Sequence, residues 1–195
     1  MLLYKPFVTF ALMNYPKIKL KKDKERSVLH FHPWVFSGAI QQQDKDLQEG
    51  DIAEVFSSTD KYLGTGHFHK GTITVRLFSF EQQEINEQFW QQKFDRAFAL
   101  RKQIGIAPNE NTNAYRLIHA EGDGMPGLIV DLYGATAVMQ THTIGMYSLR
   151  ETFAKILSKQ FKAVYDKSAD SMAKQTELIT TNEYLIKPEI GRAHV

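Results

Sequence analysis

The sequence predicts a β-rich α+β fold, in which a small N-terminal β-barrel is followed by a small antiparallel α+β domain. Three observations predict it. Short β-forming runs separated by glycines fill residues 17–80, a helical period follows over residues 81–106, and further short strands come after it. The chain has 195 residues, 43% hydrophobic and 12% aromatic, which suits a globular protein of one or two domains.

The barrel is predicted from the N-terminal runs and is expected to span residues 14–80. Ile73, Val75 and Leu77 alternate with polar residues, so they share one face of a strand. The predicted strands cover residues 51–56, 62–69 and 72–80. The glycines that separate the runs are Gly50, Gly64, Gly66 and Gly71.

A helix is predicted over residues 81–106, because apolar side chains recur there at helical spacing. These side chains are Trp90, Phe94, Ala97 and Phe98. Gly105 and Pro108 end the helix. Residues 81–108 are therefore expected to form a connecting helix between the two domains.

The second domain, residues 109–167, is predicted to be an antiparallel sheet with a helix on one face. Its strands are expected at residues 115–120, 128–132, 135–143 and 162–167. The helix is marked by apolar residues spaced by three, four and three positions, which are Met146, Leu149, Phe153 and Ile156. Residues 168–189 are polar without a clear period and are predicted to be a linker.

A glycine motif lies between two predicted strands of this domain. Gly122, Gly124 and Gly127 match the dinucleotide-binding pattern G-x-G-x-x-G. A phosphate-binding loop of that kind must follow a strand and open a helix. Here Pro126 lies inside the motif and residues 128–132 (LIVDL) form a predicted strand, so the glycines are expected to form a hairpin turn.

Alternating histidines could suit a metal, because alternate residues of a strand share a face. The pairs are His30 with His32 and His67 with His69. No carboxylate cluster follows at ligand spacing, so a polar strand face or contacts to an anion are the alternative reading. The chain has no cysteine, which excludes disulfides, thiolate metal sites and a cysteine nucleophile within these residues.

Carboxylates flank the glycine turn but do not form a recognisable site. Glu121, Asp123 and Asp131 lack the spacing of an EF-hand loop. We expect them to be solvated turn residues.

A basic run is the stronger candidate for binding. Residues 17–26 (KIKLKKDKER) hold six basic and two acidic residues, and aromatic residues follow. Cations neutralise RNA phosphates and aromatic rings stack on exposed bases. The alternative is a solvated strand with lysines for solubility and a core tryptophan. The residues predicted to contact RNA are Lys21, Lys22, Arg26, His32, Trp34 and Arg76.

Two stretches resemble one protein family. Residues 32–40 (HPWVFSGAI) resemble the start of the PUA domain of class I S-adenosylmethionine-dependent large-subunit rRNA (cytosine-C5) methyltransferases. Residues 115–133 (YRLIHAEGDGMPGLIVDLY) resemble the hairpin of the domain that follows PUA in the same proteins. The resemblance extends over residues 14–167.

The resemblance implies an RNA-binding PUA-like barrel, a central α+β domain and a C-terminal Rossmann-like methyltransferase domain. The family's cofactor loop and catalytic cysteine belong to that last domain, which we expect to be absent from this chain. No residue here matches them, so no catalytic, cofactor-binding or metal-binding residue is carried over.

Both ends of the sequence are expected to lie outside the folded domains. Residues 1–13 are predicted to be a non-native or disordered extension. Residues 190–195 (IGRAHV) resemble the translation of a common sequencing adapter. The chain is therefore expected to be an N-terminal fragment.

The resemblance implies the RNA-binding portion of a cytoplasmic 23S rRNA 5-methylcytosine methyltransferase. The intact protein would use S-adenosylmethionine and bind ribosomal RNA without a membrane, and a homodimer is left open. The fragment is expected to bind RNA but neither the cofactor nor a metal. Alternatives are a stand-alone PUA-type RNA-binding module and a metalloenzyme that uses the paired histidines.

Overall fold

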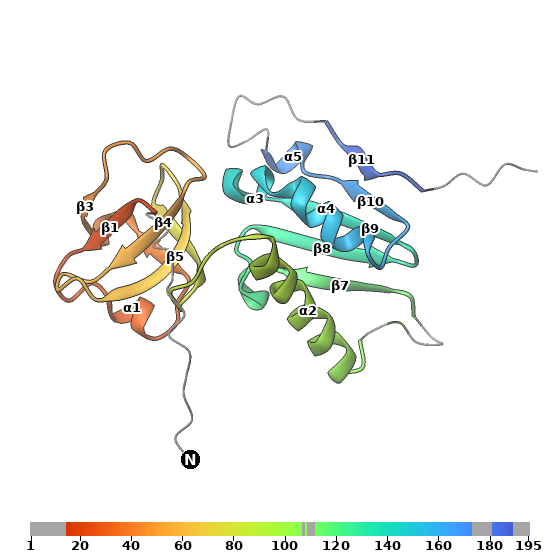
Figure 1. Cartoon of the computed structure of the whole chain (residues 1–195), viewed down its shortest axis with the longest axis horizontal. Coiled ribbons are helices and arrows are strands. Elements are labelled where there is room, and N and C mark those ends of the chain that lie inside the picture. The colour runs from red at the N-terminus through yellow and green to blue at the C-terminus, as the bar shows by residue number, and fades with distance from the viewer. Residues whose placement is uncertain (1–14, 107, 109–111, 173–180, 189–195) are drawn as a thin grey trace, which may run out of the picture.

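The computed structural model describes residues 15–106, 108, 112–172 and 181–188, and Figure 1 shows two sheets lying next to each other. The N-terminal sheet is red to yellow and the second is green to blue. This arrangement confirms the β-rich α+β class. The extension and the terminal hexapeptide that the sequence predicts lie outside the described residues.

The first sheet has six strands in the order β2-β6-β5-β4-β1-β3. The strands are β1 (Lys17–Leu20), β2 (Trp34–Phe36), β3 (Ile40–Gln43), β4 (Ile52–Phe56), β5 (Tyr62–Phe68) and β6 (Ile73–Ser79). Two short helices, α1 (Arg26–Leu29) and η1 (Ser37–Ala39), lie between them. The pairs are antiparallel except β1–β4, and the sheet curls around a core that includes Ile18, Val55 and Leu77.

A glycine lets β5 lie close to β6. A Cβ atom at Gly66 would lie 2.3 Å from the carbonyl oxygen of Arg76. Any side chain there would force the two strands apart, so the glycine is required by the pairing and not by a turn.

The second sheet has five strands in the order β11-β10-β9-β8-β7. The strands are β7 (Ala114–His119), β8 (Leu128–Tyr133), β9 (Thr136–Thr141), β10 (Ala163–Asp166) and β11 (Glu183–Ile186). The helices are α2 (Glu87–Gln103), η2 (Ala120–Asp123), α3 (Ile144–Ser148), α4 (Arg150–Ser158) and α5 (Ala169–Met172). Helices α2 and α4 contact each other and lie on the sheet, where Phe153 packs against Trp90 and Phe94.

Three features of the second sheet differ from the sequence-based expectation. The sheet is not wholly antiparallel, because α3 and α4 connect β9 to β10 as a parallel pair. Its covering helix is divided at Leu149. The range 168–189, expected to be a linker, contains α5 and β11.

Helix α2 also differs from its predicted form. It begins after Asn86, whose Oδ1 accepts a hydrogen bond from Phe89 N at 3.0 Å. Residues 81–86 are therefore not helical. Its side chains Trp90, Phe94 and Ala97 belong to the second core, so the helix does more than connect two domains.

The predicted glycine hairpin is confirmed. Strands β7 and β8 pair antiparallel across η2 and the turn. Gly124 and Gly127 have φ angles of 64° and 87°, in the left-handed region that favours glycine. A Cβ atom at Gly127 would also lie 2.7 Å from Thr143 Cγ2. The hairpin therefore needs glycine for both backbone and space.

Strand β6 contributes to both cores. Val75 and Leu77 belong to the core of the first sheet, whereas Phe78 packs in the second core beside Phe89 and Trp90. The ring centroids of Phe78 and Trp90 are 5.0 Å apart. Because alternate residues of one strand face opposite sides, β6 joins the two domains into one packed unit.

Candidate nucleic-acid interface

The first group of predicted RNA-contacting residues lies exposed in the segment between β1 and β2, which includes α1. Lys21, Lys22, Arg26 and His32 are all exposed. The Lys21 ammonium donates to Gly38 O at 3.0 Å, which positions it beside η1. The basic run does not form one solvated strand, because β1 ends at Leu20, a turn follows, and Arg26 opens α1.

The second group, Trp34 and Arg76, is half-buried where the two domains meet. The two residues are cross-strand partners, and the Arg76 guanidinium lies 5.5 Å from the Trp34 ring centroid. The Trp34 indole donates to Glu121 Oε1 at 2.9 Å, and Arg76 Nη1 lies 3.6 Å from the same oxygen. Burial lowers the pKa of Arg76, while the Glu121 charge opposes that change.

Glu121 belongs to η2, within the glycine hairpin. The cluster of Trp34, Arg76 and Glu121 therefore joins the first sheet to the hairpin of the second. Two predicted RNA contacts serve this connection, and Glu121 is not the solvated turn residue that the sequence predicts. The hydrogen bond joins residues 87 positions apart, so local spacing holds no signal for it.

Neither histidine pair forms a polar strand face. His30 follows α1 and its Nδ1 lies 2.7 Å from Arg26 O, while His32 Nδ1 accepts from Trp34 N at 3.2 Å. His67 and His69 are buried, not on a polar surface. His69 Nδ1 lies 2.8 Å from Glu49 Oε1. Among the residues that the structure describes, no group of three or more potential ligands could hold a metal ion.

His67 is part of the interface between the domains. Its ring stacks on Trp90 at 6.3 Å and meets Phe78 edge-on at 4.9 Å. A Cβ atom at Gly145, at the start of α3, would lie 2.3 Å from His67 Cγ. Burial lowers the pKa of His67 to about 3, with His69 adding to the effect, so the ring is neutral at physiological pH.

The carboxylates of the hairpin are structural. The Asp123 side chain is only 5% exposed and accepts two hydrogen bonds from the Arg101 guanidinium, at 2.6 and 2.7 Å. It also accepts from His119 N at 2.6 Å, which fixes the entry to η2. Asp131 pairs with Arg116 across β7 and β8. The expectation of solvated carboxylates is therefore wrong for Asp123.

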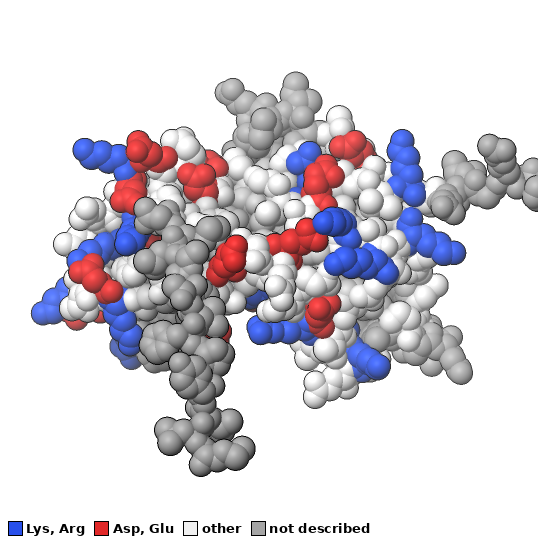
Figure 2. All heavy atoms as spheres, in the orientation of Figure 1, with Lys and Arg blue, Asp and Glu red and all other residues white. Residues whose placement is uncertain are grey.

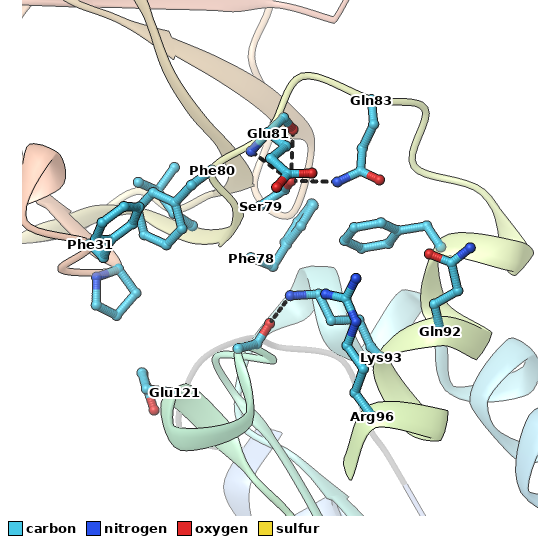
Figure 3. A pocket seen from close by; sticks show the side chains of 14 residues that line it. Phe31, Phe78, Ser79, Phe80, Glu81, Gln83, Gln92, Lys93, Arg96 and Glu121 are labelled. Carbon is cyan, nitrogen blue, oxygen red and sulfur yellow. Dashed lines mark hydrogen bonds between the residues drawn. The ribbon is translucent and has the colours of Figure 1, made fainter. Parts of the chain in front are cut away.

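A pocket of about 350 Å³ lies between the first sheet, α2 and the hairpin (Figure 3). The side chains that define its character are Phe31, Phe80, Gln92, Lys93, Arg96 and Glu121. Phe31 and Phe80 meet edge-on at 5.3 Å on one side, and α2 presents two cations on the other. Phe31, Lys93 and Arg96 are not among the residues that the sequence predicts to contact RNA, although the spacing of the two cations by three places them on one helix face.

Charges of both signs lie on the face that Figure 2 shows. In the view of Figure 2, basic and acidic side chains are interspersed over both domains and do not form one large single-sign patch. This agrees with the net charge of +2. On this face, an anion-binding site would therefore be defined by local geometry and not by a large single-sign field.

Comparison with known proteins agrees with this architecture. Residues 18–80 match the PUA-like domain family. The chain is 32% identical over 166 residues to "Ribosomal RNA large subunit methyltransferase I" of Pseudoalteromonas atlantica, covering 83% of this chain and 42% of the relative. The same-named protein of Shewanella denitrificans is 35% identical over 165 residues, covering 82% and 41%.

A solved structure shares the fold. It is a protein assigned as a SAM-dependent methyltransferase from Streptococcus mutans, with a TM-score of 0.66 and 22% identity, over 78% of this chain and 40% of that one. No helix in the described part of the chain is long and apolar enough to cross a membrane. The chain thus carries a PUA-like domain at residues 18–80 and is homologous to ribosomal RNA large subunit methyltransferases I, of which it spans about two fifths.

Proposed function

We propose that this chain binds large-subunit ribosomal RNA and orients it for methylation of a cytosine at C5, with S-adenosylmethionine as the methyl donor of the intact protein. The homology to ribosomal RNA large subunit methyltransferases I, together with the PUA-like match, carries this proposal. We propose that Lys21, Lys22, Arg26 and His32 contact the RNA, since all four are exposed. Trp34 and Arg76 act indirectly, by holding the hairpin against the first sheet.

We also propose a division of labour, in which RNA binding and methyl transfer depend on different residues of the intact protein. Methylation of cytosine at C5 needs a nucleophile on C6, normally a thiolate, and a base taken out of its stack. The 195 residues contain no cysteine. The chain therefore supplies RNA binding, whereas cofactor binding and methyl transfer depend on other residues. Work on ribosomal RNA also implies a cytoplasmic location.

The RNA-binding part of the proposal is tested by salt dependence. Anisotropy titrations with large-subunit rRNA transcripts should give a Kd that rises steeply between about 50 and 200 mM salt, as phosphate neutralisation releases counterions. The double variant Lys21→Gln/Lys22→Gln should reduce the slope of log K against log salt by about 1 or 2. Lys159→Gln/Lys162→Gln, on the second domain, is the charge-matched control and should keep the slope. An affinity independent of salt would refute RNA binding through these lysines.

The division of labour is tested separately. Titration calorimetry of the chain with S-adenosylmethionine should give no binding heat, and incubation with rRNA and labelled cofactor should transfer no methyl group. Measurable cofactor binding would overturn the division of labour while leaving the RNA-binding proposal intact.

A further inference from the structure

The pocket between the first sheet, α2 and the hairpin has features that RNA binding through the basic run does not use. Its walls come from three segments that are distant in sequence, which contain Phe31, Lys93 and Gly124. Lys93 Nζ donates to Gly124 O at 3.1 Å, which ties α2 to the hairpin at the pocket floor (Figure 3). The pocket therefore exists only while the two domains are docked.

Phe31 is an unusual residue for its position. Its backbone has a φ of 62°, in the left-handed region that bulky residues rarely adopt, and its side chain is 72% exposed. Glycine or asparagine would fit this backbone better. Its ring contact is edge-on with Phe80, so most of the aromatic surface remains accessible. An exposed ring held in such a conformation at a pocket is typical of a ligand contact.

The opposite wall supplies positive charge. Lys93 and Arg96 lie one helical turn apart on α2. Within the described residues the Arg96 guanidinium makes no hydrogen bond or ion pair, and the Lys93 ammonium uses one of its three donors on Gly124 O. Of the two carboxylates of the pocket, Glu121 is engaged by Trp34 and Arg76, and Glu81 lies across the pocket beside Ser79 (Figure 3). The two cations thus have room for an anion.

The shape and chemistry fit one nucleotide. A volume of about 350 Å³ is within the range of small-ligand sites and too small for a helical duplex. An aromatic ring suits the face of a base, and two cations suit a phosphate. The amide of Gln92 offers both donors and acceptors to a base edge.

We propose that this pocket binds one unstacked nucleotide of a single-stranded RNA segment, with the base against Phe31 and an adjoining phosphate at Lys93 and Arg96. The proposal rests on the proposed RNA-binding function and adds a subsite to it. The chain would then bind structured RNA through the exposed residues Lys21, Lys22, Arg26 and His32, and a single-stranded segment through the pocket.

The experiment measures binding of a short single-stranded RNA from the large-subunit rRNA. Phe31→Ala and Arg96→Gln should each weaken binding about tenfold, the size expected for loss of one stacked base or one phosphate contact. Phe31→Tyr keeps the ring and should bind as the parent chain does. Tyr133→Ala, which removes another exposed aromatic, and Lys102→Gln, which removes another α2 cation, are the matched controls and should change little.

A second readout places the base. Single-stranded RNA carrying 4-thiouridine should crosslink on irradiation to the peptide that contains Phe31, and mass spectrometry would identify it. Unchanged affinity of Phe31→Ala and Arg96→Gln, while Lys21→Gln/Lys22→Gln still weakens rRNA binding, would refute the pocket and leave the proposed function standing. If the parent chain binds no RNA, both the proposed function and the pocket proposal are refuted. If free cytidine monophosphate competes as well as the RNA does, the pocket binds a free nucleotide, and the proposal of a single-stranded RNA segment is refuted.

Discussion

An ion pair between Arg101 and Asp123 lies beneath the hairpin of the second domain. Arg101 and Asp123 are both largely buried, and their bidentate contact is supplemented by Arg101 Nε donating to Arg116 O at 3.1 Å. Removing one partner of a buried pair leaves the other charge without compensation. The pair therefore fixes the hairpin that carries Glu121 to the first sheet.

Asp123→Ala should reduce the free energy of unfolding by about 3–5 kcal/mol, because it strands the buried Arg101 guanidinium. Asp131→Ala removes the more exposed pair with Arg116 and should reduce it by at most about 1 kcal/mol. Urea unfolding followed by circular dichroism measures both. Equal effects of the two variants would contradict a buried structural role for Asp123.

Gly145 sets the distance between α3 and β5. A methyl group there would meet the His67 ring at 2.3 Å, and the buried ring has no room to retreat. Gly145→Ala should therefore destabilise the chain by about 1–3 kcal/mol, the usual cost of overpacking. Gly71→Ala is the control, since nothing lies within 4 Å of its added Cβ. If urea unfolding gives the same free energy of unfolding for both variants, α3 and β5 move apart at this contact at little cost.

At the level of elements, β5 carries a pH-dependent contribution to stability. Burial lowers the folded-state pKa of His67 to about 3, below the ordinary value of 6.5. Between these values the unfolded state binds more protons, so stability falls as pH falls from about 6.5 toward 3 and is unaffected by this group above 6.5.

The expected slope is about 1.4 kcal/mol per pH unit over the window from pH 6 to pH 4. His69 contributes in the same direction, because burial lowers its pKa too. His67→Gln keeps His69, so the difference in slope between the parent and this variant isolates His67. Urea unfolding at several pH values measures the slopes, and parallel slopes would show that His67 is protonated in the folded chain.

The elements that the sequence predicts well are those with a strong period on one buried face. In β6, Val75 and Leu77 are buried as their alternation indicates. The break between α3 and α4 is invisible in the apolar spacing, because Leu149 with φ −95° and ψ 2° departs little from a helical path. Strand β11 is half-exposed and, among the strands that the structure describes, pairs only with β10, so its apolar pattern is weak.

The candidate site could be predicted only in part. The exposed cations around α1 follow from the local run of basic residues. The pocket could not be predicted, since Phe31, Lys93 and Glu121 come together only when the two sheets dock. For the same reason, Trp34 and Arg76 resemble RNA contacts in the sequence, whereas Glu121 engages them in the fold.

For the whole molecule, the shared strand β6 determines how the two domains unfold. Leu77 lies in the first core and its neighbour Phe78 in the second, where it packs against Phe89 and Trp90. His67 on β5 crosses the same boundary to Trp90. A strand that belongs to two cores cannot leave one without disturbing the other. We therefore expect one cooperative transition, in which separate probes of the two domains coincide.

Phe78→Ala tests this coupling. The ring is buried, so its loss should reduce the free energy of unfolding by about 3–5 kcal/mol. The two tryptophans report from different domains, Trp34 from the first sheet and Trp90 from α2. In each of the backgrounds Trp34→Phe and Trp90→Phe, urea unfolding followed by fluorescence should coincide with unfolding followed by circular dichroism, and Phe78→Ala should lower the midpoint in both backgrounds. A Trp34 signal that keeps its midpoint while the Trp90 signal shifts would mean that the domains unfold independently, and the pocket between them would then open before either domain is lost.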